Sequence, residues 1–129
     1  MPEKGIDNQI YVAILPHMKV INERDRVSAQ LKADVLKALG HPTRLMMVEA
    51  LAGGERCVCE LNELVEADHS TISKHLAILK QAGVVSDRKE GLKVFYRLEV
   101  PCIMRFLGCV TSVVESRSTR HLAAVKGRG

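Results

Sequence analysis

Residues 69–81 constrain the fold most, because a helix over this segment has two sharply different sides. At about 100° per residue, Ile72, His75, Leu76 and Leu79 lie on one side and Ser70, Lys74, Ala77 and Gln81 on the other. Asp68 is a good N-cap for this helix. A tight connection over 66–68 joins it to another short helix expected over 57–65. The pair therefore packs on one face and leaves a small, polar and basic face open.

Two more helices are expected before this pair. Apolar residues repeat at every fourth position up to Gly40, at Val27, Leu31, Val35 and Leu39. Pro42 begins the next helix, since proline is favoured at the first helical position, and Gly53-Gly54 ends it.

The second half of the chain indicates a β-hairpin and a last helix. β-branched and aromatic residues occupy 84–85 and 94–98, with a charged turn over 87–91 between them. Pro101 opens the last helix. Its apolar stripe needs a partner helix and consists of Ile103, Phe106, Leu107, Val110, Val113 and Val114.

This order of elements predicts a mainly α fold with a small β-hairpin wing, a winged helix-turn-helix. The 129 residues suit one domain, expected over 26–122, with an N-terminal extension over 1–25 and a tail over 123–129. The alternative is an ordinary small α+β domain whose surface charges are only solvated.

The distribution of charge favours a polyanionic partner. The net charge is +4, but residues 42–69 carry two basic and six acidic residues, whereas residues 70–98 carry six basic and two acidic residues. Double-stranded DNA is the obvious partner for a basic helix followed by a basic hairpin. A merely solvated basic face is the competing interpretation.

Other classes of protein fit less well. The longest purely apolar stretch, which ends at Leu15, is far shorter than the ~18 residues of a membrane span, so we expect a cytoplasmic protein with no membrane partner. Four cysteines are too few for a disulfide scaffold and are expected to be reduced. A phosphate-binding glycine loop and a paired catalytic constellation are both missing, which argues against an enzyme.

The stretch 39–98 resembles the ArsR/SmtB family of metal-sensing winged-helix repressors. The matching segments are Leu39-Gly40-His41-Pro42-Thr43-Arg44-Leu45, Glu55-Arg56-Cys57-Val58-Cys59-Glu60-Leu61, Ser70-Thr71-Ile72-Ser73-Lys74-His75-Leu76, Asp87-Arg88-Lys89-Glu90-Gly91 and Val94-Phe95-Tyr96-Arg97-Leu98. The resemblance implies a homodimer that binds operator DNA and releases it when an inducer arrives. It also implies a dimer interface made by the 27–39 helix and the C-terminal helix.

The same resemblance assigns the candidate DNA contacts. In the first turns of the 69–81 helix, short hydroxyls and a lysine can reach phosphates or base edges, and wing cations can follow the backbone or the minor groove. For His75, packing and DNA contact are equally open, and each wing cation could be a solvated surface charge. The candidates are Ser70, Thr71, Ser73, Lys74, His75, Arg88, Lys89 and Lys93.

Cys57 and Cys59 are the candidate inducer ligands. Residues i and i+2 of a regular helix point about 200° apart, so these thiols can share one ion only at a loose first turn. The segment 55–61 is similar to the inducer motif of arsenite and antimonite repressors and overlaps that of cadmium and lead sensors. The resemblance implies As(III)/Sb(III) or a soft divalent ion (Cd, Pb, Zn) as inducer, because soft thiolates select such ions. The alternative is a pair of small packing residues.

The chain departs from the arsenite pattern at Asn62, where some members carry a third thiol. Cys102 and Cys109 are the other candidates, but they lie about 10.5 Å apart along one helix and cannot both bind one ion. One of them could complete a site across the dimer or form a second one; the alternative is packing in the interface. His121 lacks a partner for the family's zinc site, and His17 is isolated.

Two further hypotheses compete with metal release. The cysteines could form a redox or persulfide switch on the same DNA-binding fold, although the 45–51 helix has no cysteine of the kind that such relatives use. A small metal carrier would bind ions without sequence-specific affinity for DNA.

Overall fold

The structure, a computed structural model of the chain, describes the backbone of residues 20–128 and the side chains of residues 20–120. The predicted extension up to residue 19, with His17, lies outside the described residues, as do the side chains of His121 and the tail. The chain divides into two units between Asp34 and Val35, and the second unit carries the candidate sites.

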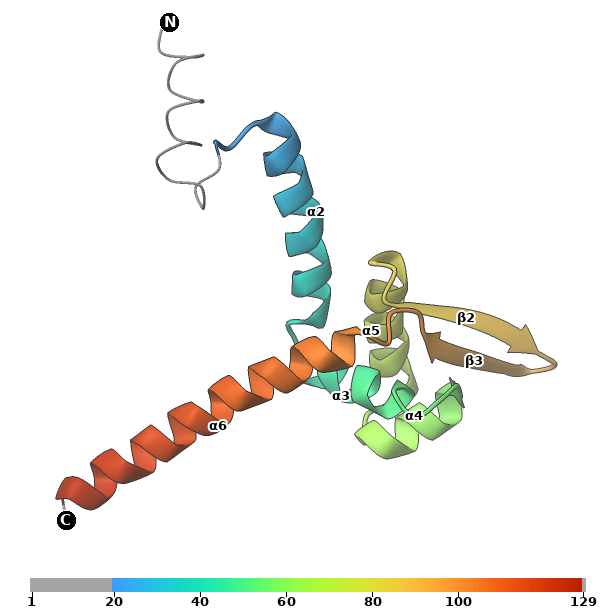
Figure 1. Cartoon of the computed structure of the whole chain (residues 1–129). Helices are drawn as coiled ribbons and strands as arrows, with labels where there is room; N and C mark the ends of the chain where they lie inside the picture. Colours follow the sequence, from blue (N-terminus) through green and yellow to red (C-terminus); the bar gives the residue numbers. More distant parts are fainter. Residues whose placement is uncertain (1–19, 129) are drawn as a thin grey trace, which may run out of the picture. The chain divides into compact units, whose positions relative to one another are not determined.

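Five helices and three strands follow one another along the described residues (Figure 1). They are α2 (Glu23–Leu39), α3 (Pro42–Leu51), β1 (Arg56–Cys57), α4 (Val58–Val65), α5 (His69–Gln81), β2 (Val85–Glu90), β3 (Lys93–Leu98) and α6 (Ile103–Arg128). None of the helices in this part of the chain is long and apolar enough to cross a membrane.

Capping side chains set where the helices begin. Asn22 Oδ1 accepts from the backbone N–H of Asp25 at 3.0 Å and Asp25 Oδ2 accepts from that of Asn22 at 3.2 Å, so α2 begins four residues before the predicted Val27. At α3, the ring nitrogen Nδ1 of His41 accepts from the N–H of Thr43 at 3.1 Å, and Pro42 occupies the first helical position as predicted.

The helix α5 begins and ends where the sequence predicts. Asp68 Oδ1 caps it by accepting from the backbone N–H of Thr71 at 2.7 Å. Hydrogen bonds from Thr71, and then from Ser70, hold the pKa of the Asp68 carboxyl below its usual value. The turn before it is tight because Glu66 adopts a left-handed backbone, φ 54°, directly after α4.

The three strands form one antiparallel sheet in the order β1-β3-β2. The predicted turn over 87–91 is wrong in extent: strand pairing continues to Glu90 opposite Lys93, and the turn is only Gly91-Leu92. Gly91 supplies the positive φ, 62°, that the first position of such a two-residue turn needs. The third strand, β1, was not predicted, because two residues carry no periodic pattern. Figure 1 shows the hairpin of β2 and β3 projecting from the helices α3, α4 and α5.

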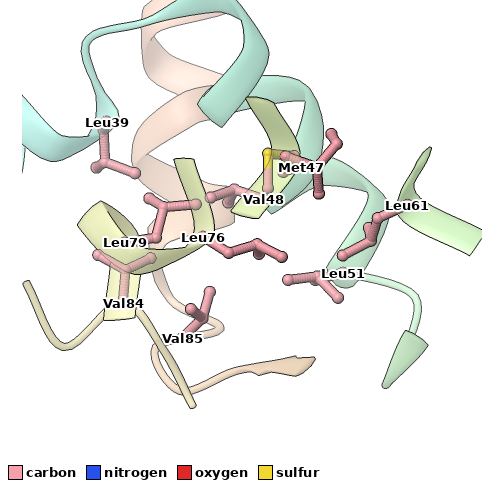
Figure 2. Packing of buried hydrophobic residues seen from close by; sticks show 10 residues of the cluster. Leu39, Met47, Val48, Leu51, Leu61, Leu76, Leu79, Val84 and Val85 are labelled. Atoms are coloured by element: carbon pink, nitrogen blue, oxygen red, sulfur yellow. The ribbon is translucent and has the colours of Figure 1, made fainter. Parts of the chain in front are cut away.

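One hydrophobic core holds α3, α4, α5 and the start of β2 together (Figure 2). The predicted core positions Ile72, Leu76 and Leu79 of α5 are buried. The other members of the cluster are Leu39, Met47, Val48, Leu51, Leu61, Val84 and Val85. Leu64 of α4, in contrast, is 55% exposed.

Candidate DNA-reading face and cysteine site

The open face of α5 carries the short polar residues that the sequence predicts. Ser70, Ser73 and Lys74 are exposed and Thr71 is half-buried, all within the first two turns of the helix. The Ser70 hydroxyl donates to Asp68 Oδ1 at 2.9 Å, so that the cap and the first turn form one hydrogen-bonded unit. This face is unobstructed within the second unit and is suited to contacts with phosphates and base edges.

His75 is held within the protein and not on this face. Its Nδ1 lies 3.0 Å from Nη1 of Arg44 in α3, and its ring lies 4.5 Å from the ring of His41, centroid to centroid. Burial, and then the charges of His41 and Arg44, lower the pKa of His75 below the ordinary imidazole value. Arg44 Nε also donates to the carbonyl of Ala38 at the end of α2. His75 therefore packs in a network that joins α5 to α3 and to the end of α2.

The cations of the wing fall into two groups. Arg88 is clamped: its guanidinium makes bonds of 2.7 to 3.1 Å to both carboxylate oxygens of Glu55, bonds Glu90 at 2.7 Å, and lies 4.7 Å from the ring centroid of Phe95. The hydrogen bonds to Arg88 lower the pKa of Glu55. In contrast, Lys89 and Lys93 are exposed, and neither has an ion pair within the described residues.

Cys57 and Cys59 are brought together at the start of α4. Cys57 is buried and caps the helix with an extended backbone, φ −79° and ψ 162°, while Cys59 is exposed in the first turn. Because Cys57 is not helical, the two side chains do not point apart as in a regular helix. The structure joins them in a disulfide, with 5.4 Å between the Cα atoms, where the sequence predicts reduced thiols. Cys102 and Cys109 are free and exposed.

The cysteine pair opens onto a pocket of about 220 Å³ that also touches both candidate DNA-reading elements, α5 and the wing. Its walls come from α4, the first residue of α5 and the tip of the wing: Cys57, Val58, Cys59, Asn62, His69, Leu92, Lys93 and Val94. The side-chain oxygen Oδ1 of Asn62 is buried and has no hydrogen-bond partner among the described residues. Nowhere in this part of the chain do three Cys, His, Asp or Glu side chains gather in a way that could hold a metal ion.

The sheet connects the cysteine pair to the clamped arginine. Cys57 of β1 lies opposite Phe95 of β3, and Phe95 lies opposite Arg88 of β2, so that the three residues form one row across the sheet. Glu55, two residues before Cys57, holds the Arg88 guanidinium. Sequence reasoning missed Glu55, Arg44 and Asn62 as functional candidates. The partners of Glu55 and Arg44 lie 31 to 33 residues away in the sequence, and Oδ1 of Asn62 has no hydrogen-bond partner among the described residues.

Comparisons with known proteins agree with this geometry. A family model described as "Bacterial regulatory protein, arsR family" matches residues 41–87. An uncharacterized HTH-type transcriptional regulator of Methanocaldococcus jannaschii is 49% identical over 65 residues, which are 50% of this chain and 73% of that protein. An arsenic resistance transcriptional regulator of Pseudomonas putida is 47% identical over 70 residues, 52% of this chain and 55% of that protein.

A solved structure agrees over a larger share of the chain. It is the homodimeric winged helix-turn-helix DNA-binding domain of a possible ArsR-family transcriptional regulator from Mycobacterium bovis. The two share 29% identity with a TM-score of 0.67, over 80% of this chain and 95% of that one. The predicted winged helix-turn-helix fold is therefore confirmed, and the chain belongs to the arsR family of bacterial DNA-binding transcriptional regulators.

Proposed function

We propose that this protein is a homodimeric repressor that releases its operator DNA when As(III), Sb(III) or another thiophilic ion binds Cys57 and Cys59. The observation that carries the proposal is the pocket beside the cysteine pair. It is lined by His69, the first residue of α5, and by Lys93 of the wing, so a ligand there touches both elements that face DNA. The similarity to an arsenic resistance regulator supports the choice of ion.

DNA would be bound by the open face of α5 and by the exposed lysines of the wing. Ser70, Thr71, Ser73 and Lys74 would reach the major groove and its phosphates, and the exposed Lys89 and Lys93 would reach the backbone beside it. His75, which is bonded to Arg44, would position α5 and not contact DNA itself. Arg88 contributes only when its clamp by Glu55 and Glu90 opens.

Two routes would couple the cysteines to α5 and the wing. Cys57 and Cys59 sit at the start of α4, whose Leu61 shares the core with α5. In addition, Cys57 is paired with Phe95 in the sheet, and the Phe95 ring stacks on Arg88. An ion that draws the two sulfurs around itself would shift β1 and the first turn of α4, and so move α5 and the wing together.

For Cys102 and Cys109 we propose a contribution from the partner protomer or a second site of their own. Both are exposed, and within the described residues neither gathers with Cys57 and Cys59 into a metal-binding group. Inducer affinity of the variants Cys102→Ser and Cys109→Ser tests this contribution. An unchanged affinity in both variants would show that neither cysteine takes part.

The experiment that tests the function is fluorescence anisotropy of the reduced protein on DNA from its own upstream region. Arsenite, antimonite, Cd(II), Pb(II) and Zn(II) are added in parallel. We expect tight, salt-sensitive binding that arsenite or antimonite abolishes. Failure to bind DNA, or binding that is indifferent to every ion, contradicts the proposal.

The disulfide between Cys57 and Cys59 favours one second candidate, a thiol-based redox or persulfide switch on the same fold. A hydroperoxide would oxidise the two thiols to the disulfide and itself be reduced to an alcohol and water. This candidate predicts that oxidised and reduced protein differ in DNA affinity while every ion is without effect. The same anisotropy assay, repeated after treatment with hydroperoxide, separates the two functions.

A further inference from the structure

We infer that Cys57 and Cys59 bind trivalent arsenic or antimony as a dithiolate that keeps one hydroxyl group, and that Asn62 accepts a hydrogen bond from that hydroxyl. This inference rests on the proposed function and specifies its ligand. It assigns the third position on the ion to oxygen, so that Cys102 and Cys109 would form a second site and not complete this one.

The first observation is the position of Asn62. It follows Cys59 by three residues on α4, and side chains with this spacing are neighbours on one face of a helix. Asn62 lines the same pocket as both cysteines. A ligand held between the two sulfurs therefore lies in a pocket that Asn62 helps to line.

The second observation is the unpaired acceptor. Oδ1 of Asn62 is buried and no described residue donates a hydrogen bond to it. Buried polar atoms are normally paired, and one that is not requires an explanation such as a ligand. An amide oxygen can only accept, so the group that would satisfy it must bring an N–H or O–H.

The chemistry of arsenite supplies such a group. Arsenous acid, As(OH)₃, reacts with two thiols to give (RS)₂As–OH and two molecules of water. Two As–O bonds are replaced by two As–S bonds, the thiol protons leave in the water, and no electrons are transferred. The remaining As–OH can donate to Oδ1 of Asn62 once this buried side chain turns toward the pocket. Val58, Leu92 and Val94 give the pocket apolar walls, which suit this uncharged adduct.

Within the described residues, the other donors are consistent with this assignment. No third Cys, His, Asp or Glu gathers with the pair, so a protein ligand of those types does not compete for the third position within one chain. The side chain three residues after Cys59 is the one amide in the wall of the pocket. A thiolate at this position would displace the hydroxyl from arsenic. An amide does not displace the hydroxyl, but it can accept a hydrogen bond from it.

The inference separates two kinds of arsenical. Phenylarsine oxide carries a carbon on arsenic and uses both of its remaining positions for the two sulfurs, so its adduct has no hydroxyl. Arsenite binding should depend on Asn62 and phenylarsine oxide binding should not. This difference is a readout that a merely structural role of Asn62 would not produce.

The experiment compares reduced full-length wild type with Asn62→Leu, Asn62→Asp and the control Glu63→Gln, an exposed α4 residue outside the pocket wall. Isothermal titration calorimetry measures binding of arsenite and of phenylarsine oxide. Asn62→Leu should fold, because an apolar group replaces an unpaired polar one. We expect it to bind arsenite about tenfold more weakly and phenylarsine oxide unchanged. Asn62→Asp, which keeps an acceptor, should stay close to wild type for both.

X-ray absorption of the arsenite complex should show two sulfurs and one oxygen around arsenic. Three sulfurs, an equal loss for both arsenicals in Asn62→Leu, or no loss for either would overturn the inference and leave the proposed function standing. If reduced wild type binds neither arsenical, the proposed function fails and this inference fails with it.

Discussion

The imidazole of His75 fills a space between helices where a positive charge is disfavoured. Arg44 donates toward its Nδ1 from one side and the ring of His41 lies against it, so its surroundings already contain a fixed cation. Burial is the largest cause that lowers its pKa. The neutral form of His75 is therefore part of the packing that places α5.

This arrangement predicts a pH-dependent stability. Because the pKa of His75 is lowered in the folded state, the unfolded chain binds the proton more readily. The contribution of neutral His75 to the free energy of unfolding is complete above the ordinary imidazole pKa of about 6.5. It is lost as the pH falls from there through the lower pKa of the folded state. The free energy of unfolding of wild type, from urea titrations at about pH 7.5 and pH 5.5, should fall more than that of His75→Gln. Equal losses in the two proteins would contradict this account.

We expect Glu55 to compete with DNA for Arg88. Its two oxygens hold the guanidinium that would otherwise be available to a phosphate. Glu55→Gln should therefore bind DNA several-fold more tightly, and the slope of log K against log salt should steepen by about one phosphate contact. The control is Glu63→Gln. It also removes one negative charge, this time from α4, but it does not release Arg88 of the wing. Equal effects of the two substitutions would show that only net charge matters.

Among the residues of α4, Leu61 is the one that is fully buried in the core, and Val58 and Val65 pack against the core from partly buried positions. Leu61 is fully buried, whereas Leu64 on the same helix is 55% exposed. Leu61→Ala should lower the free energy of unfolding by about 2–5 kcal/mol, and Leu64→Ala by about 0.5 kcal/mol or less. Chemical denaturation of the two variants measures the difference. Similar losses would mean that the helix packs through another face.

Local patterns predicted the helices and the wing well, and long-range pairing less well. The wheel of 69–81 and the cap at Asp68 fixed α5 correctly, because both depend on neighbouring residues. The strand β1 exists only because β3 pairs with it, and the turn at Gly91-Leu92 is set by the register of Glu90 with Lys93.

The candidate sites show the same division. The cysteine pair and the hydroxyls of α5 could be found as motifs, since they lie within a few residues of one another. The clamp of Arg88 by Glu55 and the bond of Arg44 to His75 join residues far apart in the sequence. These contacts depend on the folded sheet and helices, so no local sequence pattern predicts them.

For the molecule as a whole, the apolar face of α6 predicts a dimer. Phe106, Val110, Val113 and Val114 are between 41% and 58% exposed, although they continue the stripe that Leu107 and Ile103 bury on the core. The similar Mycobacterium bovis domain is homodimeric. Val110→Glu combined with Val113→Glu should give a monomer in sedimentation velocity and weaken DNA binding at least tenfold, because two half-sites no longer act together. Ser112→Glu, on the opposite and exposed side of α6, is the control. A dimer that survives the double substitution would place the interface elsewhere.

The central claim is that a thiophilic ion at Cys57 and Cys59 releases the DNA. The most direct measurement is the anisotropy of labelled upstream DNA, titrated with arsenite in the presence of reduced wild type, Cys57→Ser or Cys59→Ser. The account predicts that arsenite releases DNA from wild type, while both variants bind the DNA normally and keep it at every arsenite concentration. Release from the variants at the same arsenite concentration as from wild type would contradict it.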